Sequence, residues 1–196
     1  MSGGVGGVLL AAGAGRRYGL PKALAVAHGQ LFLEIALAAL RDGGCHPVVV
    51  VLGAAADRIR LVADLDGATV VVNRDWSTGM GSSLRVGLHT LRPAGVTAAV
   101  VQVVDTPGVS AAAVARLAAH AGERTIAAAT YRGRQGHPVL LGRAHWPGVT
   151  RMAAGDTGAR PYLVARARTL LAVPCDDLGD GVDVDRPAGL PDGSDA

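Results

Sequence analysis

The chain has few cysteines, few aromatic residues and no long apolar run. Its two cysteines, Cys45 and Cys175, lie far apart and form no Cys-x-x-Cys pair, which argues against a zinc knuckle or a redox pair. Aromatic residues make up 3% and the basic residues form no block, so we expect no nucleic-acid surface. No stretch reaches the ~18 uninterrupted apolar residues of a membrane span. The first residues lack the basic start of a secretory signal, and we expect a cytoplasmic protein.

The composition and length predict one folded globular domain. Hydrophobic residues make up 49% and charged residues 18%, a balance typical of a packed core rather than of disorder. The length of 196 residues fits one domain. Eighteen of the 19 basic residues are arginine, and the net charge is +3. Arginine suits anionic groups such as phosphate, so small anionic substrates are favoured.

Short β-branched runs alternate with Ala- and Leu-rich stretches in the first part of the chain. The predicted strands cover 5–10, 48–52, 69–72 and 98–104, and the predicted helices cover 32–41, 54–63, 81–91 and 110–121. Strands that are apolar throughout have both sheet faces covered. Strands that alternate with helices favour right-handed parallel crossovers. The sequence therefore predicts an α/β fold, a three-layer αβα sandwich with a Rossmann-like, mostly parallel sheet in a single domain.

The second half of the chain is less regular. We predict strands over 125–131 and 138–141 joined as a hairpin, a helix over 158–167 capped by Asp156 or Thr157, and a short strand over 172–175. The last ten residues, PAGLPDGSDA, have the composition of a flexible tail. The predicted organisation is one domain over residues 1–186 followed by a tail over 187–196.

A glycine-rich loop with three cations follows the first predicted strand. It reads LLAAGAGRRYGLPK over residues 9–22 and contains Arg16, Arg17 and Lys22. In open α/β sheets ligands bind beyond the carboxyl ends of strands, and glycines let backbone N–H groups approach phosphate oxygens. The pattern indicates a phosphate-binding loop, and a tight turn with solvated arginines is the alternative.

The loop does not match the two best-known nucleotide motifs. The Walker A pattern needs Gly-Lys-Ser/Thr, which Pro21-Lys22 does not supply. Gly13, Gly15 and Gly19 read GxGxxxG, one residue longer than the dinucleotide pattern, and Pro21 disfavours a helix starting there. An NAD(P)H-binding loop, with Glu34 as ribose partner, remains an alternative.

Six segments occur in the order found in one known family. The loop is the first; the others are NRDWSTGMGSSL over 73–84, VDTP over 104–107, GHPV over 136–139, GDTGAR over 155–160 and DVDRP over 183–187. Together they resemble the nucleotidyltransferases related to molybdenum cofactor cytidylyltransferase. The resemblance extends over residues 5–187, almost the whole chain.

The resemblance implies a reaction and its participants. A nucleoside triphosphate, most simply CTP, would react with a phosphorylated acceptor such as molybdopterin cofactor and release pyrophosphate. Mg²⁺ would be the cofactor, and a molybdoenzyme that receives the product is the implied protein partner. We expect no nucleic-acid or membrane partner, and a monomer or weak dimer. Because the acceptor phosphate is already an anion, no histidine base is required.

The resemblance also assigns roles to residues. Arg16, Lys22 and Asp105 would be catalytic, with Lys22 and Arg16 holding the triphosphate. Asp105 and Asp185 would bind the metal, with Asp183 competing for the second position. The nucleotide would contact Leu10, Ala11, Ala12, Gly13, Gly15, Lys22, Asn73 and Ser82. The plain alternatives are that Asp105 and Asn73 serve turns, that Ser82 begins a helix, and that 183–185 is a solvated acidic edge.

The identity of the base and the chemistry leave alternatives open. Family members that use guanine tend to read LAGG, where this chain has LAAG, and the Ala12 methyl would crowd a purine amine. CTP is therefore favoured, with guanylyl transfer as an alternative. Thr106 and Arg186 depart from the residues usual in close relatives. Some relatives are described as reductases of small aromatic pigments, so an NAD(P)H-dependent reductase is a second hypothesis. A non-catalytic pterin-cofactor carrier is a third.

Overall fold

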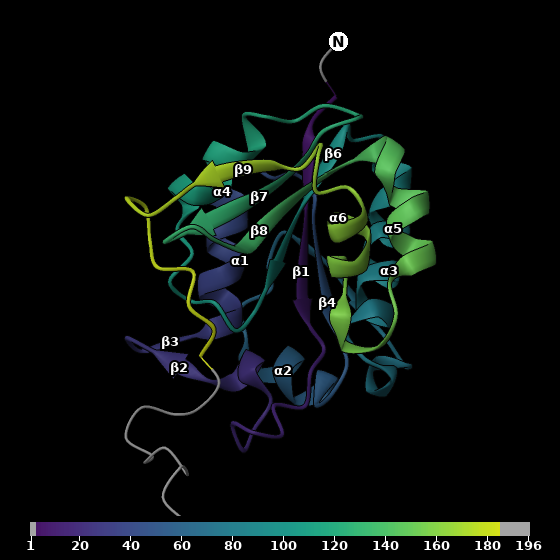
Figure 1. The fold of residues 1–196 in the computed structure, drawn as a ribbon. Coiled ribbons are helices and arrows are strands. Elements are labelled where there is room, and N and C mark those ends of the chain that lie inside the picture. The colour runs from purple at the N-terminus through teal and green to yellow at the C-terminus, as the bar shows by residue number, and fades with distance from the viewer. Residues whose placement is uncertain (1–2, 185–196) are drawn as a thin grey trace, which may run out of the picture.

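Seven strands form one central sheet in the computed structural model, which describes residues 3–184 (Figure 1). The predicted metal ligand Asp185 and the predicted tail over 187–196 lie outside the described residues. The strand order is β5-β4-β1-β6-β8-β7-β9. Their bounds are β1 Val5–Ala11, β4 Val48–Leu52, β5 Ala68–Val72, β6 Ala98–Val103, β7 Ile126–Tyr131, β8 Arg134–Gly142 and β9 Leu171–Pro174.

Helices cover both faces of this sheet. Their bounds are α1 Phe32–Asp42, α2 Ala56–Val62, α3 Met80–Leu91, α4 Ala111–Ala118, α5 Trp146–Met152 and α6 Arg160–Ala165. Alternate strand residues point to opposite faces. Leu9, Val50 and Val100 therefore pack with α1, α2 and α4, and Val8, Val51 and Val101 pack with α3, α5 and α6. The three-layer αβα fold in a single domain is confirmed.

One strand runs against the others in the described sheet. β7 and β8 form the predicted hairpin, but β8 lies between β6 and β7 and pairs antiparallel with both. β9 then pairs parallel to β7 at the edge. The sheet is therefore mostly parallel, as predicted, with its reversed strand inside it.

Several local predictions are refined. The Ser110 hydroxyl caps α4 by accepting a hydrogen bond from the Ala113 N–H at 3.2 Å, as expected. Asp156 and Thr157 do not cap α6, because they belong to a separate 3₁₀ turn over Gly155–Thr157. In that turn the Thr157 N–H and hydroxyl both donate to the Ala154 carbonyl, at 3.3 and 2.8 Å. Helix α5 and the small hairpin β2 (Val26–Ala27) and β3 (Gln30–Leu31) were not predicted.

The helices of the described region are short. None of them combines the length and apolar character that would let it cross a membrane.

Candidate functional site

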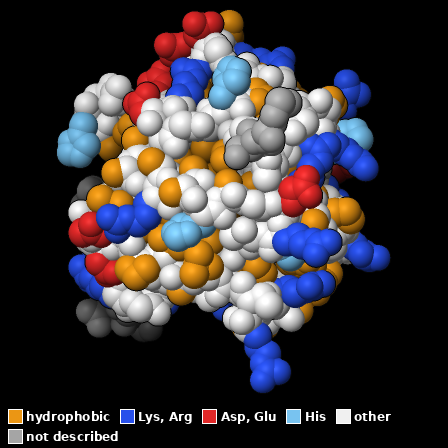
Figure 2. Space-filling view, turned by 90° about the horizontal axis from the view of Figure 1, so that it is seen from above, with side chains coloured by type: hydrophobic (Ala, Val, Ile, Leu, Met, Phe, Trp, Pro, Cys, Tyr) orange, Lys and Arg blue, Asp and Glu red, His pale blue; other side chains and the backbone are white. Residues whose placement is uncertain are grey.

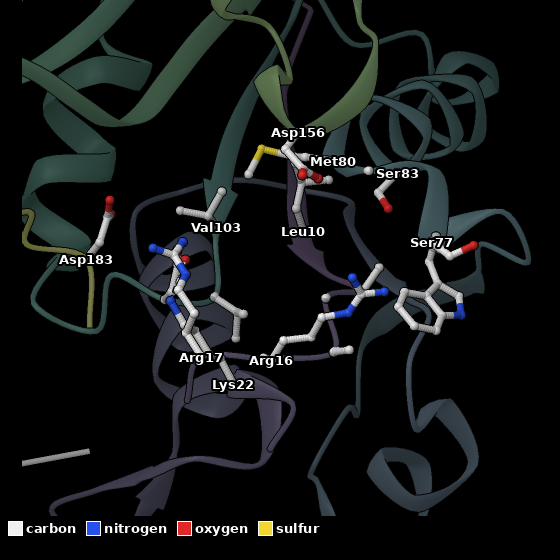
Figure 3. Close-up of a pocket in the computed structure, with 18 residues that line it drawn as sticks. Leu10, Arg16, Arg17, Lys22, Ser77, Met80, Ser83, Val103, Asp156 and Asp183 are labelled. Carbon is white, nitrogen blue, oxygen red and sulfur yellow. Dashed lines mark hydrogen bonds and ion pairs between the residues drawn. The ribbon is translucent and has the colours of Figure 1, made fainter. Parts of the chain in front are cut away.

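A cavity of about 500 Å³ opens where the carboxyl ends of β1 and β6 meet (Figure 3). The glycine-rich loop that follows β1 forms one side of it. Its other walls come from the start of α3, the chain after β6, the Gly155–Thr157 turn and Asp183. This is the edge of an open α/β sheet at which ligands are expected.

The glycine-rich loop turns sharply at Gly15. The Tyr18 and Gly19 N–H groups both donate to the Gly15 carbonyl at 2.9 Å. Gly15 has a φ of +61°, and a Cβ there would lie 1.8 Å from the Leu20 carbonyl oxygen. Only glycine fits where the chain crosses itself this closely. The crossing directs residues 16–22 along the cavity and delivers Lys22, at the start of a 3₁₀ turn, to its wall.

Lys22 and Asp105 meet inside this cavity. The Lys22 Nζ donates to Asp105 Oδ2 at 3.1 Å, and the two side chains are 14% and 27% exposed. They stand on the loops that follow two adjacent parallel strands, β1 and β6. The Arg16 guanidinium points to the side of the cavity where Ser77 lies, whereas Arg17 and Lys22 point toward Val103 (Figure 3). The site therefore combines a cationic loop with a carboxylate.

A second carboxylate lines the same cavity. The Val184 N–H donates to the Asp105 carbonyl at 2.8 Å, which fixes the segment carrying Asp183 beside Asp105. Within residues 3–184 no group of three or more His, Cys, Asp or Glu side chains is arranged to hold a metal. Mg²⁺ usually takes one or two carboxylates together with phosphate oxygens and waters. Asp105 and Asp183 fit an ion that is bound together with a triphosphate.

The predicted nucleotide contacts divide into two groups. Leu10, Ala12, Gly13 and Gly15 line the cavity, together with Arg16 and Lys22. Ala11 does not, because its side chain packs in the core beneath α1 and is 1% exposed.

Asn73 and Ser82 lie behind the cavity wall rather than on it. The Asn73 amide donates to the Ser82 and Ser83 hydroxyls at 2.8 and 3.0 Å, and its oxygen accepts from the Asp75 N–H at 3.0 Å. The Ser82 hydroxyl lies 2.8 Å from the Gly79 carbonyl oxygen. These bonds hold the turn over 75–79 against α3 and present Ser83 to the cavity. Both residues thus take part in the turn and the helix start, and their contact with a nucleotide stays a prediction.

The structure adds residues that were not predicted to line the site. Trp76 lines the cavity together with Met80, Ser83 and Asp156. The turn that carries Asp156 abuts the start of α3: a Cβ on Gly79 would lie 2.3 Å from the Gly155 carbonyl carbon. The glycines flanking both segments were the available sequence signal for this close contact.

His137 lies on β8 close to these carboxylates. Burial lowers the pKa of its imidazole, while a hydrogen bond to the Val101 carbonyl and the nearby Asp105 and Asp183 act in the opposite direction. The ring Nδ1 is 3.3 Å from that carbonyl oxygen, so Nδ1 carries the proton of the neutral ring. The lowered pKa favours the neutral form of this imidazole.

Comparison with protein families decides the family. The sequence model of one protein family, described as MobA-like NTP transferase domain, matches residues 7–174. The chain belongs to this family. Membership places it among nucleotidyltransferase enzymes, which use a nucleoside triphosphate and a phosphorylated acceptor.

Individual relatives of this MobA-like chain carry different descriptions. It is 40% identical over 192 residues, covering 92% of each chain, to the nicotine blue oxidoreductase of Paenarthrobacter nicotinovorans. It is 32% identical to the crystal structure of Rv0371c from Mycobacterium tuberculosis, with a TM-score of 0.81 over 95% of this chain and 94% of that one. A manganese complex of Rv0371c is 29% identical, with a TM-score of 0.74 over 97% and 94% of the two chains.

Proposed function

We propose that this MobA-like protein transfers CMP from CTP to a phosphorylated acceptor such as molybdopterin cofactor, with Mg²⁺ as the divalent ion. The observation that carries the proposal is the cavity in which the glycine-rich loop and Lys22 face Asp105 and Asp183. The manganese complex of the related Rv0371c supports a divalent ion.

The proposed reaction needs charge neutralisation more than proton transfer. An oxygen of the acceptor phosphate forms a bond to the α-phosphorus of the triphosphate. The bond from that phosphorus to the bridging oxygen breaks, and pyrophosphate leaves with the electron pair. The attacking oxygen is already an anion at neutral pH, so no side chain has to remove a proton. Positioning and electrostatic stabilisation do most of the work in such transfers.

The cationic loop supplies much of that stabilisation. Arg16 and Lys22 line the cavity and bind the triphosphate in this proposal, and Lys22 is also the partner of Asp105. When the triphosphate enters, the Lys22 ammonium moves from Asp105 to a phosphate oxygen, which frees the carboxylate as a metal ligand. A divalent ion held by Asp105 and Asp183 would supply further positive charge to stabilise the leaving pyrophosphate.

Ala12 supports the choice of CTP. It lines the cavity, and in the proposed binding mode its methyl group would lie beside the base. We expect Ala12→Gly to raise kcat/KM for GTP relative to CTP, because that change removes the methyl that would crowd a purine amine. An unchanged ratio would remove Ala12 from the choice of base.

Reduction of a small aromatic substrate with NAD(P)H is the second candidate, favoured by the relative named nicotine blue oxidoreductase. Dinucleotides usually place their pyrophosphate on the helix that directly follows the glycine loop. Here a 3₁₀ turn and the β2–β3 hairpin come first, and α1 begins only at Phe32. Glu34 is also engaged, since its carboxylate accepts from the Leu31 and Asp64 N–H groups at 3.1 and 2.9 Å. These contacts favour nucleotidyl transfer.

One experiment separates the two candidates. The protein is incubated with Mg²⁺, molybdopterin and each of the four ribonucleoside triphosphates, and pyrophosphate is measured. In parallel, NADH and NADPH are titrated without metal while protein fluorescence is followed. We expect pyrophosphate release, fastest with CTP, and no tight dinucleotide binding. No pyrophosphate release with any of the four triphosphates, together with tight, metal-independent NAD(P)H binding, would favour the reductase instead.

A further inference from the structure

The layer formed by α3, α5 and α6 carries mostly positive charge. Residues 80–92 and 143–170 contain seven arginines and one carboxylate, Asp156. The rest of the chain has more acidic than basic residues, although the whole molecule is positive. Seen from above, basic side chains gather on the side of the molecule where these helices lie (Figures 1 and 2).

Part of this layer is hollowed into a groove of about 980 Å³ between α3 and α5. Four arginines line it, and we call it the arginine groove after them: Arg85, Arg92, Arg143 and Arg151. His89 also lines it, and among the described residues no Asp or Glu does. Besides Thr90 and Thr150, the other lining residues are apolar: Val71, Val86, Leu88, Trp146 and Pro147. The groove is thus amphiphilic, since it combines an apolar surface with positively charged side chains.

Two of the guanidinium groups are held in place by backbone carbonyls. Arg143 donates to the Val96 and Arg92 carbonyls at 3.1 and 2.8 Å, and its guanidinium carbon lies 5.4 Å from the Trp146 ring centroid. Arg85 donates to the Ala153 carbonyl. Carbonyls orient these groups but leave their positive charge uncompensated by any carboxylate in the lining. A cleft lined by charge of one sign concentrates ions of the opposite sign.

We infer that the arginine groove is a second ligand site, separate from the nucleotide cavity, for an organic anion with an apolar body. Guanidinium groups bind carboxylate, sulfonate or phosphate oxygens through paired N–H donors. The apolar lining suits an aromatic or aliphatic body, and the volume lies in the range of small-molecule sites. The site shares only α3 with the cavity, which α3 reaches through Met80 and Ser83.

The two tryptophans of the chain allow the groove to be tested by itself. Trp76 lines the nucleotide cavity and Trp146 lines the arginine groove. In a Trp76→Phe variant the remaining tryptophan emission comes from Trp146 in the groove wall, and the charge variants below distinguish probe in the groove from probe bound elsewhere. The probe is the aromatic sulfonate 8-anilinonaphthalene-1-sulfonate, which accepts excitation energy from tryptophan. We expect saturable quenching of Trp146 emission as the probe is added.

Charge variants then decide whether the arginines hold the probe. Arg92 and Arg151 are exposed, and we expect Arg92→Glu with Arg151→Glu, in the Trp76→Phe background, to weaken probe binding at least about tenfold, equivalent to ~1.4 kcal/mol. The matched control is Arg58→Glu with Arg60→Glu, exposed residues of α2 on the other side of the sheet. The milder pair Arg92→Gln and Arg151→Gln should weaken binding less, and it keeps the test informative should the double Glu variant fail to fold.

Competition completes the experiment. Inorganic phosphate should displace the probe more effectively than chloride at matched ionic strength. Equal probe affinity in the Arg92/Arg151 variants and the α2 control, or equal displacement by phosphate and chloride, would overturn the inference. No triphosphate is used, so this result is independent of whether nucleotidyl transfer is confirmed.

Discussion

At the scale of single residues, the site is organised around one ion pair, Lys22 with Asp105. The two residues are far apart in sequence and meet because their loops follow adjacent strands. A carboxylate and an ammonium that meet in a partly buried cavity hold each other in a defined orientation. In the proposed reaction each exchanges this partner for a ligand, Lys22 for phosphate and Asp105 for the metal.

Asp105→Asn tests the carboxylate. We expect kcat for pyrophosphate release to fall by about 100-fold or more, since removing one preorganised electrostatic group commonly costs that much. Mn²⁺ affinity, followed by electron paramagnetic resonance in the presence of CTP, should weaken as well. The matched control is Asp177→Asn, because Asp177 is exposed and pairs with Arg116 away from the cavity. Unchanged kcat and Mn²⁺ affinity would exclude Asp105 from the metal site.

His137 gives the protein a predicted pH dependence of stability. Burial lowers its pKa from the ordinary value of 6.5, so the unfolded chain takes up the proton more readily than the folded one. The unfolding free energy should therefore be highest above pH 6.5 and decline as the pH falls below it. Denaturant titrations at several pH values should show a shallower decline for His137→Asn than for the exposed control His120→Asn. Identical slopes would contradict this origin.

At the scale of elements, the glycine-rich loop and helix α3 decide where the functional groups stand. The loop crosses itself at Gly15 and so carries Lys22 to the cavity. Helix α3 contributes Met80 and Ser83 to the cavity at its start and Arg85 to the arginine groove further along, and Arg92 follows directly after its last residue. Arg85 also holds the Ala153 carbonyl, just before the turn that presents Asp156 to the cavity. One helix thus borders both sites.

Two glycines of the loop should respond differently to alanine. Gly15→Ala should lower the unfolding free energy by at least about 1 kcal/mol, because its left-handed φ and the close Leu20 carbonyl both oppose a side chain. Gly13→Ala is the matched control, since a Cβ at Gly13 meets nothing within 4 Å. Urea denaturation measures both variants. Equal stability would mean that the loop rearranges without cost.

At the scale of the whole molecule, β8 joins the two parts of the sheet. It lies between β6 and β7, and its residues face cores on both sides. Leu140 of β8 is fully buried beneath the α1 and α4 layer. The fold depends on this late strand being inserted among strands that precede it in the chain.

Leu140→Ala should therefore destabilise the whole domain. Removing a fully buried leucine side chain commonly costs ~2–5 kcal/mol, because apolar contact is lost and a cavity remains. Leu61→Ala is the matched control, since Leu61 is 86% exposed and should change stability by less than about 0.5 kcal/mol. Chemical denaturation of both variants provides the comparison, and the unfolding curves are fitted with one shared dependence of the unfolding free energy on denaturant concentration. A small loss for Leu140→Ala would mean that the core refills the space.

Local patterns in the sequence were sufficient for much of this description. Apolar runs and glycine-rich turns predicted most strands, the principal helices of both layers and the three-layer fold, because periodicity and turn chemistry act over a few residues. The family resemblance, rather than local patterning, assigned Lys22 and Asp105 to one site, and the two residues meet because the carboxyl ends of β1 and β6 share an edge of the sheet. Ser110 as a helix cap belongs to the same class of local signal.

Tertiary structure alone decided the order of the strands in the sheet, the places of Asn73 and Ser82, and the arginine groove. The position of β8 inside the sheet depends on pairing between distant segments, which no local pattern encodes. Asn73 and Ser82 stand behind the cavity wall because their polar groups bond to each other and to the turn over 75–79, and the sequence shows only that they are polar. Arg85 and Arg151 come together in one groove because α3 and α5 pack side by side. Charges distant in sequence add up only where packing brings them together.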